Sequence, residues 1–285
     1  LWEIDVFGRL RRRLEAAAAT HEGAAENYRQ AWVLLSAEIA KEYVTYRNIQ
    51  ALLRISRENL RAQRHTLELT ERLLEEGVGT LFDVTRAKSL FKATESEIPK
   101  YEGLLAESQH KLELLIAARP GALSAELAKE APVPVPRNRD ILVKPAATLR
   151  LRPDVRESER NLAAATANQG AAFAELFPKI SVAAFMGVQN SDLENLFRSS
   201  AFSWASGSAI MQPVFNFGRI RAGIDLADAR QREAYLEYEK TILEALKETE
   251  TALRLLVKEE ERRQHLEISV GHLREARRLA ELRYR

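Results

Sequence analysis

The sequence predicts a mainly α-helical protein with a small β part, built from long antiparallel coiled-coil helical hairpins that are continued by strands. One motif recurs far along the chain, which indicates two structural repeats. Two proline-free stretches are each long enough for a helix of about 100 Å. Two neighbouring segments alternate in apolar character with the period of a β-strand and carry no charge.

The repeated motif reads FGRLR at residues 7–11 and FGRIR at residues 217–221, so the two copies are 210 residues apart. A seam with alternating spacings of four and three residues follows each copy at the same distance, beginning at Trp32 and at Ile242. This spacing averages about 3.5 residues per turn, which keeps one side of a helix facing its partners in a left-handed supercoil. The repeat therefore predicts two halves of one architecture.

The composition fits long amphipathic helices, with 46% hydrophobic and 29% charged residues. A net charge of +2 offers no concentrated basic stripe, so no nucleic-acid partner is expected. The chain has no cysteine, which excludes thiol catalysis and a disulfide framework. No apolar run reaches the roughly 18 residues of a membrane-spanning helix, whereas a membrane-spanning strand needs only about 10 alternating residues.

The first half, residues 1–118, is predicted to hold the end of a strand and a helical hairpin. No proline interrupts the helical pattern at residues 9–75, and a second helix is expected at 83–118. Pro99 falls inside this second helix and should kink or break it.

The turn between these helices is unusually apolar. Gly77 supplies the left-handed residue that ends the first helix, and either Thr80 or Asp83 could cap the next one. Loops are usually polar, and exposed apolar patches often mark a partner site. Both a contact site and simple packing stay open for the four apolar residues of this turn, which are Val78, Leu81, Phe82 and Val84.

Residues 119–149 are predicted to form an extended connector on the outside of the helical body, because prolines alternate with valines there. The second half, residues 150–285, opens with a helix at Pro153, since proline fits the first helical turn. Alanine-rich sequence continues this helix to Phe177, and Pro178 ends it.

A strand hairpin is expected at about 179–216. Apolar residues alternate from Ile180 onward and again from Phe202, with a polar loop at about 190–200. Neither strand carries a charge, which predicts lipid-facing strands of a transmembrane β-barrel with Phe202 and Trp204 at the membrane interface. A hairpin packed on a soluble core is the alternative. Arg219 then begins a second helix of about 100 Å.

Five motifs in order give the chain a resemblance to outer-membrane efflux proteins of the TolC superfamily, in the lipoprotein-type branch of OprM-like and NodT-like channels. The motifs are WEIDVFGR at residues 2–9, EGVGT at 76–80 with Asp83 and Val84, LRPDVR at 151–156, LFPKIS at 176–181, and QPVF at 212–215 with FGR at 217–219.

The resemblance implies a homotrimer in the outer membrane of a Gram-negative bacterium, with strands in contact with outer-membrane lipid and a large periplasmic helical tube. A periplasmic adaptor (membrane fusion protein) would dock at the hairpin tips and link the tube to an inner-membrane efflux pump. The protein would be a passive exit duct of a tripartite efflux system, with no enzymatic activity and no cofactor. It also implies a fragment, since the family's upstream hairpin, signal peptide and lipidated cysteine would precede Leu1 and its last helix would follow Arg285.

Two sets of site residues follow from the resemblance. A gate contact maps to Asp83 and Tyr284, where a phenol would donate a charge-assisted hydrogen bond to a carboxylate. Asp83 as a helix cap without a gating role is the alternative. The adaptor-facing tip maps to Gly77, Val78, Gly79, Thr80 and Leu81.

A purely structural coiled-coil scaffold without channel activity is the rival function, but it leaves the uncharged hairpin unexplained. A lipid-binding amphipathic bundle would need no register-matched repeat. Glu107 and His110 have the Glu-x-x-His spacing of di-iron bundles, which require a second such pair. Glu261 and His265 have a different spacing, so no metal site is expected.

Overall fold

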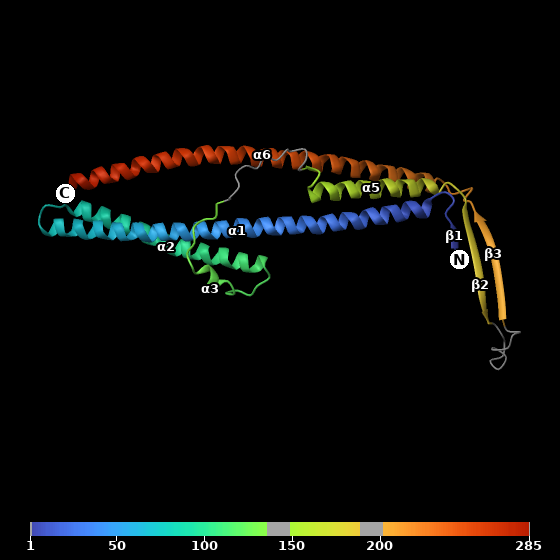
Figure 1. Cartoon of the computed structure of the whole chain (residues 1–285), viewed down its shortest axis with the longest axis horizontal. Coiled ribbons are helices and arrows are strands. Elements are labelled where there is room, and N and C mark those ends of the chain that lie inside the picture. Colours follow the sequence, from blue (N-terminus) through green and yellow to red (C-terminus); the bar gives the residue numbers. More distant parts are fainter. Residues whose placement is uncertain (1, 136–148, 189–201, 285) are drawn as a thin grey trace. The chain divides into compact units, whose positions relative to one another are not determined.

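The computed structural model describes residues 2–135, 149–188 and 202–284 of the 285-residue chain. Helices form most of this part, and three strands form one small sheet (Figure 1). None of the helices in these ranges carries an apolar stretch long enough to cross a lipid bilayer. In chain order the elements are β1 (Trp2–Ile4), α1 (Arg9–Glu75), α2 (Leu81–Leu115), α3 (Ser124–Leu127), α5 (Pro153–Ala174), β2 (Lys179–Val188), β3 (Phe202–Met211) and α6 (Arg219–Tyr284).

Tertiary contacts divide the chain into two compact units. The first, here called the sheet unit, comprises residues 1–30 and 142–285, and the second, the hairpin unit, comprises residues 31–141. Helix α1 runs through both units without a break. The sequence predicts three parts, at residues 1–118, 119–149 and 150–285. These bounds come from the duplicated motif and not from tertiary contacts, and they stay a prediction.

The two long helices begin in the same way, as the repeated motif predicts. Gly8 and Gly218 have φ values of +79° and +81°, a left-handed conformation that glycine adopts without a steric cost. The amide of Arg12 donates to the carbonyl of Gly8, and that of Ala222 donates to the carbonyl of Gly218, both at 2.9 Å. The helices have 67 and 66 residues, which at about 1.5 Å per residue confirms the predicted pair of about 100 Å each.

The sheet is antiparallel with the strand order β1-β2-β3. Trp2 pairs with Val182, and Met186 pairs with Trp204 farther along the hairpin. The two ten-residue strands confirm the predicted hairpin. Strand β2 begins at Lys179, one residue before the predicted strand, so the expectation of a wholly uncharged strand was wrong at its first position. The predicted loop at 190–200 lies outside the described residues.

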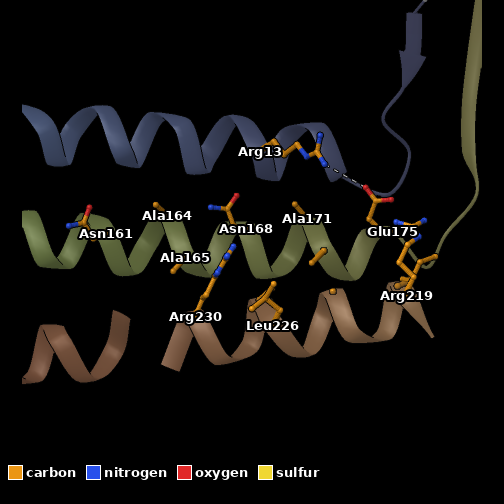
Figure 2. Close-up of a pocket in the computed structure, with 14 residues that line it drawn as sticks. Arg13, Asn161, Ala164, Ala165, Asn168, Ala171, Glu175, Arg219, Leu226 and Arg230 are labelled. Atoms are coloured by element: carbon orange, nitrogen blue, oxygen red, sulfur yellow. Dashed lines mark ion pairs between the residues drawn. The ribbon is translucent and has the colours of Figure 1, made fainter. Parts of the chain in front are cut away.

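In the sheet unit, α5 lies between the first part of α1 and α6 (Figure 2). Arg160 of α5 donates to Glu22 of α1 at 3.2 Å, and Gln169 donates to Asp228 of α6 at 2.7 Å. Small side chains let helices approach closely, and α5 buries a stripe of them, comprising Ala164, Ala167, Ala171 and Ala174.

Helix α5 begins at Pro153 as predicted but ends at Ala174 rather than Phe177. The amides of Glu175, Leu176 and Phe177 each donate to the carbonyl three residues earlier, at 3.1–3.2 Å. Such bonds tighten the end of a helix into 3₁₀-type turns. The predicted end was wrong because the chain already leaves the α-helical path three residues before Pro178.

In the hairpin unit, α1 and α2 pack around a small core of Tyr46, Leu112 and Leu127. Beside it, the hydroxyl of Ser108 on α2 donates to the carboxylate of Glu42 on α1 at 2.6 Å, with both side chains buried. A buried carboxylate without such a donor would be costly. This bond therefore fixes the packing of α1 against α2 at one position.

Helix α2 differs from the prediction at its ends. It runs from Leu81 to Leu115, not over residues 83–118. It ends early because Ala117 takes a positive φ of 55°, which stops helical hydrogen bonding. Pro99 does not break the helix. Because Pro99 is exposed, water can satisfy the carbonyl that loses its backbone donor there.

The connector starts with a turn that is capped by a buried carboxylate. Glu113, only 1% exposed, accepts hydrogen bonds from the amides of Gly121 at 2.9 Å and Leu123 at 3.1 Å. Gln109 donates to the same carboxylate at 2.9 Å. Burial alone would raise the pKa of Glu113, but these three hydrogen bonds outweigh it and lower the pKa.

Beyond this turn, the connector is docked on α1 by helix α3, which the sequence analysis did not predict. Leu127 is buried, and its carbonyl accepts from Tyr46, Arg47 and Gln50 at 3.3–3.4 Å. Arg47 also donates to the carbonyl of Lys129 at 2.8 Å. The expectation of a purely extended connector was therefore wrong for its first part, and residues 136–148 lie outside the described residues.

Candidate functional site

The tip of the helical hairpin is a turn that two glycines shape for different reasons. Gly77 has a φ of +78°, and a Cβ added there would meet no atom within 4 Å. Gly79 lies against the end of α1, where an added Cβ would be 2.9 Å from the amide nitrogen of Leu74. The amides of Val78 and Gly79 both donate to the carbonyl of Leu73, at 2.9 and 2.7 Å. The five predicted tip residues therefore lie together in one turn.

The start of α2 is held by a reciprocal cap. Thr80 is the N-cap, and its hydroxyl accepts from the amide of Asp83 at 3.2 Å. The same hydroxyl donates to the Asp83 carboxylate at 2.5 Å. Of the two caps that the sequence left open, Thr80 is the N-cap, and the Asp83 carboxylate holds its hydroxyl in place.

Three apolar side chains cover the outside of this turn. Val78 is 77% exposed, Leu81 69% and Phe82 71%, whereas Val84 is half-buried. Helix packing within the hairpin unit does not use these three side chains. An exposed apolar cluster next to a rigid turn is typical of a contact site for another macromolecule.

The structure describes the side chain of only one of the two predicted gate residues. Asp83 belongs to the hairpin unit and contacts Thr80. Tyr284 is the last residue of α6, and its side chain lies outside the described part of the chain. The contact between Asp83 and Tyr284 therefore stays a prediction.

The sheet has two chemically different faces. Residues that pair directly share a face, and neighbours in a strand point to opposite faces. One face, here called the apolar face, carries most of the large exposed apolar side chains of the sheet, including Met186, Trp204 and Ile210, whereas Phe185 and Met211 are exposed on the opposite face. Glu3 and Lys179 both lie on the opposite face, because Glu3 pairs with Ser181, two residues beyond Lys179. Both charges of the described sheet are therefore on one side.

Ionic contacts join this sheet to the helices. Arg9 donates to the Glu3 carboxylate at 2.6 and 2.8 Å, and its pKa is raised chiefly by this hydrogen bond. Glu175 lies 2.7 Å from Lys179 and 3.6 Å from both Arg9 and Arg13. The hydrogen bond from Lys179, with the two arginines adding to it, lowers the pKa of Glu175 against the effect of burial.

An aromatic contact strengthens the same junction. The rings of Phe7 and Phe177 stack with centroids 4.7 Å apart, and the side-chain amide of Gln212 donates to the backbone carbonyl of Leu176 at 2.9 Å. Sequence reasoning missed this junction because its partners are far apart in the chain. The signal was present, since the motifs at residues 2–9, 176–181 and 212–215 each supply part of it.

A groove of about 670 Å³ lies on the same unit, lined by α1, α5 and α6 (Figure 2). Arg13, Arg219 and Arg230 line it together with Glu175.

The Glu107 and His110 pair does not form a set of metal ligands. The carboxylate of Glu107 instead lies 2.8 Å from the ammonium group of Lys111. No group of three or more His, Asp or Glu side chains among the described residues could hold a metal ion.

Comparison with known proteins agrees with this architecture. The family model described as outer membrane efflux protein matches residues 1–118 and 145–285. A probable efflux pump outer membrane protein of Pseudomonas putida, TtgC, is 32% identical over 289 residues, covering 100% of this chain and 58% of the relative. The cation efflux system protein CusC of Escherichia coli is 31% identical over 259 residues, covering 89% of this chain and 55% of the relative.

Among solved structures, the outer-membrane channel OprN is similar with a TM-score of 0.87 and 35% identity, over 92% of this chain and 58% of that channel. The chain thus spans a little over half the length of the proteins that it matches. The family match covers both copies of the duplicated motif and every described helix and strand except α3. The chain belongs to the outer membrane efflux protein family.

Proposed function

We propose that the chain forms part of a passive exit duct through the outer membrane in a tripartite efflux system. Family membership favours this function over a structural coiled-coil scaffold, since the relative in P. putida is named an efflux pump outer membrane protein. The proposal involves no catalytic step and no cofactor.

The separation of charge between the two sheet faces carries the proposal. Met186, Trp204 and Ile210 are each more than 70% exposed on the apolar face, whereas the other face carries both charges besides the exposed Phe185 and Met211. A strand surface in water would gain from charges on an exposed face, and a lipid-facing surface would be destabilised by them. The apolar face is therefore proposed to contact outer-membrane lipid, with the helices in the periplasm of a Gram-negative bacterium.

The hairpin tip is proposed to bind the periplasmic adaptor, which would connect the duct to an inner-membrane efflux pump. Val78, Leu81 and Phe82 form an exposed apolar cluster beside a turn that contains two glycines and is capped by Thr80. A rigid apolar cluster loses little conformational entropy on binding, which favours it as the centre of an interface.

Assembly as a homotrimer is proposed from family membership together with the coiled-coil seam. Leu256, the last seam residue in the second repeat, is 54% exposed on α6. Apolar side chains at coiled-coil spacing are stabilised when they pack into a facing helix. A neighbouring copy would supply such a helix.

Asp83 is proposed to hold the duct shut through Tyr284, in addition to its capping role. Two variants of the full-length protein separate these roles. Asp83→Asn weakens a hydrogen bond to a phenol, so it should raise single-channel conductance in planar lipid bilayers. Thr80→Val removes the cap but keeps the carboxylate, so conductance should stay low. Equal conductance of Asp83→Asn and the unmodified protein would argue against the gate.

The duct itself is tested by a pair of neighbouring alanines. Ala184 lies on the apolar face and Ala183 on the opposite face, and both are exposed. Ala184→Arg should lower membrane insertion of the full-length protein, since arginine on a lipid-facing strand costs about 2–4 kcal/mol near the bilayer centre. Ala183→Arg should insert and conduct ions. Equal insertion of the two variants, or a protein that needs no detergent and conducts no ions, would refute the proposal.

A further inference from the structure

The groove on the sheet unit has an excess of positive charge that the described residues do not neutralise. Glu175 is the one acidic residue among its described lining, and Lys179, Arg9 and Arg13 already surround its carboxylate. Figure 2 shows an ion pair only between Arg13 and Glu175. Arg219 and Arg230 form no ion pair within the described part of the chain.

The duplicated motif shows how this excess arises. Arg9 and Arg219 occupy equivalent positions at the start of the two long helices. Arg9 is neutralised by Glu3 at 2.6 Å, but the position equivalent to Glu3 in the second copy is Pro213. The second copy keeps the arginine and lacks its carboxylate partner, so Arg219 is left available to another anion.

The same comparison explains the space beside these arginines. The residue equivalent to Arg13 in the second copy is Gly223, which lines the groove. A Cβ added to Gly223 would meet no atom within 4 Å. A long side chain in the first copy is therefore replaced by open space in the second.

The groove combines this charge with an apolar floor. Asn161 and Asn168 of α5 add amide donors at its edge. A volume of about 670 Å³ falls in the range of small-molecule sites, roughly 300–1,000 Å³. The floor consists of small and aliphatic side chains, including Ala164, Ala171, Ile220 and Leu226.

We propose that this groove binds a small amphiphilic organic anion, with its anionic group held by Arg230 and its apolar body on the alanine floor of α5, while Arg219 adds positive potential from the other end of the groove (Figure 2). Guanidinium groups donate to carboxylate, sulfonate or phosphate oxygens in charge-assisted hydrogen bonds. This assignment goes beyond the exit-duct proposal, because binding is measured directly and needs no transport.

The probe is naphthalene-1-sulfonate, compared with the uncharged naphthalene-1-sulfonamide. Isothermal titration calorimetry on the full-length protein in a non-ionic detergent should show saturable binding of the sulfonate, with one site per chain. Its affinity should fall as ionic strength rises, since the arginines are exposed and salt screens them. The sulfonamide should bind at least about fivefold more weakly.

Substitutions locate the site. Arg230→Gln should weaken sulfonate binding by about fivefold, and Arg219→Gln, which acts at longer range, by about twofold. Arg221→Gln is the matched control, because Arg221 is exposed on the same helix and does not line the groove, and it should leave the affinity unchanged. Gly223→Leu fills the groove without changing its charge and should weaken binding by about tenfold.

Three results would overturn the proposal. Unmodified protein without saturable sulfonate binding would show that the groove is closed or already filled, for example by a carboxylate of a second copy. Loss of trimer assembly in the Arg219→Gln, Arg230→Gln double variant would then assign these arginines to that contact. Equal affinity for the sulfonamide, or equal affinity of Arg221→Gln and Arg230→Gln, would show binding elsewhere. A thermal unfolding curve for each variant checks that it is folded.

Discussion

The turn at the hairpin tip makes a quantitative prediction about two neighbouring glycines. Replacing Gly79 by alanine puts a Cβ 2.9 Å from the Leu74 amide nitrogen and 3.0 Å from the Leu73 carbonyl carbon, both backbone atoms. Relief of such overpacking costs about 1–3 kcal/mol. It would also disturb two amide hydrogen bonds to the Leu73 carbonyl, each contributing about 0.5–1.5 kcal/mol. We expect Gly79→Ala to destabilise the tip by about 3 kcal/mol.

Gly77→Ala should cost much less, although Gly77 has the unusual backbone angle. An added Cβ meets no atom within 4 Å there, so only the left-handed conformation is penalised, by about 1–2 kcal/mol. Gly103 provides the matched control on α2. A Cβ there also meets nothing within 4 Å, and its helix-interior position means that Gly103→Ala should stabilise α2 by about 0.5–1 kcal/mol.

Hydrogen exchange followed by mass spectrometry on the full-length protein measures these local differences. Peptides over residues 70–85 should exchange about 150-fold faster in Gly79→Ala and about 5–30-fold faster in Gly77→Ala, since about 1.4 kcal/mol is a factor of ten. Peptides around residue 103 should exchange more slowly in Gly103→Ala. If Gly79→Ala were as mild as Gly77→Ala, the close approach of the turn to the end of α1 would be wrong.

Three further changes test other contacts. Thr80→Val should destabilise the first turn of α2 by about 1 kcal/mol and Thr80→Ser should not, as measured by exchange at residues 81–84. A hydrogen bond from Arg152 holds the pKa of Asp154 below its usual value of 3.8. The ionised Asp154 therefore stabilises α5 above pH 3.8, and this stabilisation is lost as the pH falls through the lower pKa of the folded state. Asp154→Asn should remove this acid dependence of hydrogen exchange at residues 153–158. Glu3→Gln leaves Arg9 without its paired carboxylate, so the amides of β1 should exchange about tenfold faster, and unchanged exchange would show that the pair does not hold β1.

The predictions that the structure confirms depend on local signals. Pro153 begins α5 because proline fits only the first helical turn. The strands at Lys179–Val188 and Phe202–Met211 follow a two-residue alternation that no helix would show. Gly77 ends the first helix of the hairpin through its own left-handed angle. The assignment of residues 77–81 as an adaptor-facing tip came from the family resemblance, and it stays a prediction.

The features that the sequence did not reveal depend on residues far apart. Helix α3 is held because the carbonyl of Leu127 accepts from Tyr46, Arg47 and Gln50, which are about 80 residues away. In the sequence, Glu113 looks like any other charged residue of a helix. Only the structure shows that its carboxylate is buried and accepts from the amide of Gly121 at the start of the connector. Composition and periodicity carry no information on such pairings.

Comparison of the two copies separates what determines the fold from what determines a site. Both copies keep the glycine with φ near +80° at the start of the long helix, although Phe217 also has a positive φ of 52° and its equivalent Phe7 does not. The side chains around that glycine have diverged, since Arg9 has Glu3 as its partner whereas Arg219 has a proline in the equivalent place. Backbone angles and helical period are shared constraints, because losing them would disrupt a helix of about 100 Å. An ion pair at the helix start has no such constraint, so one copy can use it to fix the sheet while the other presents a free guanidinium group to a groove.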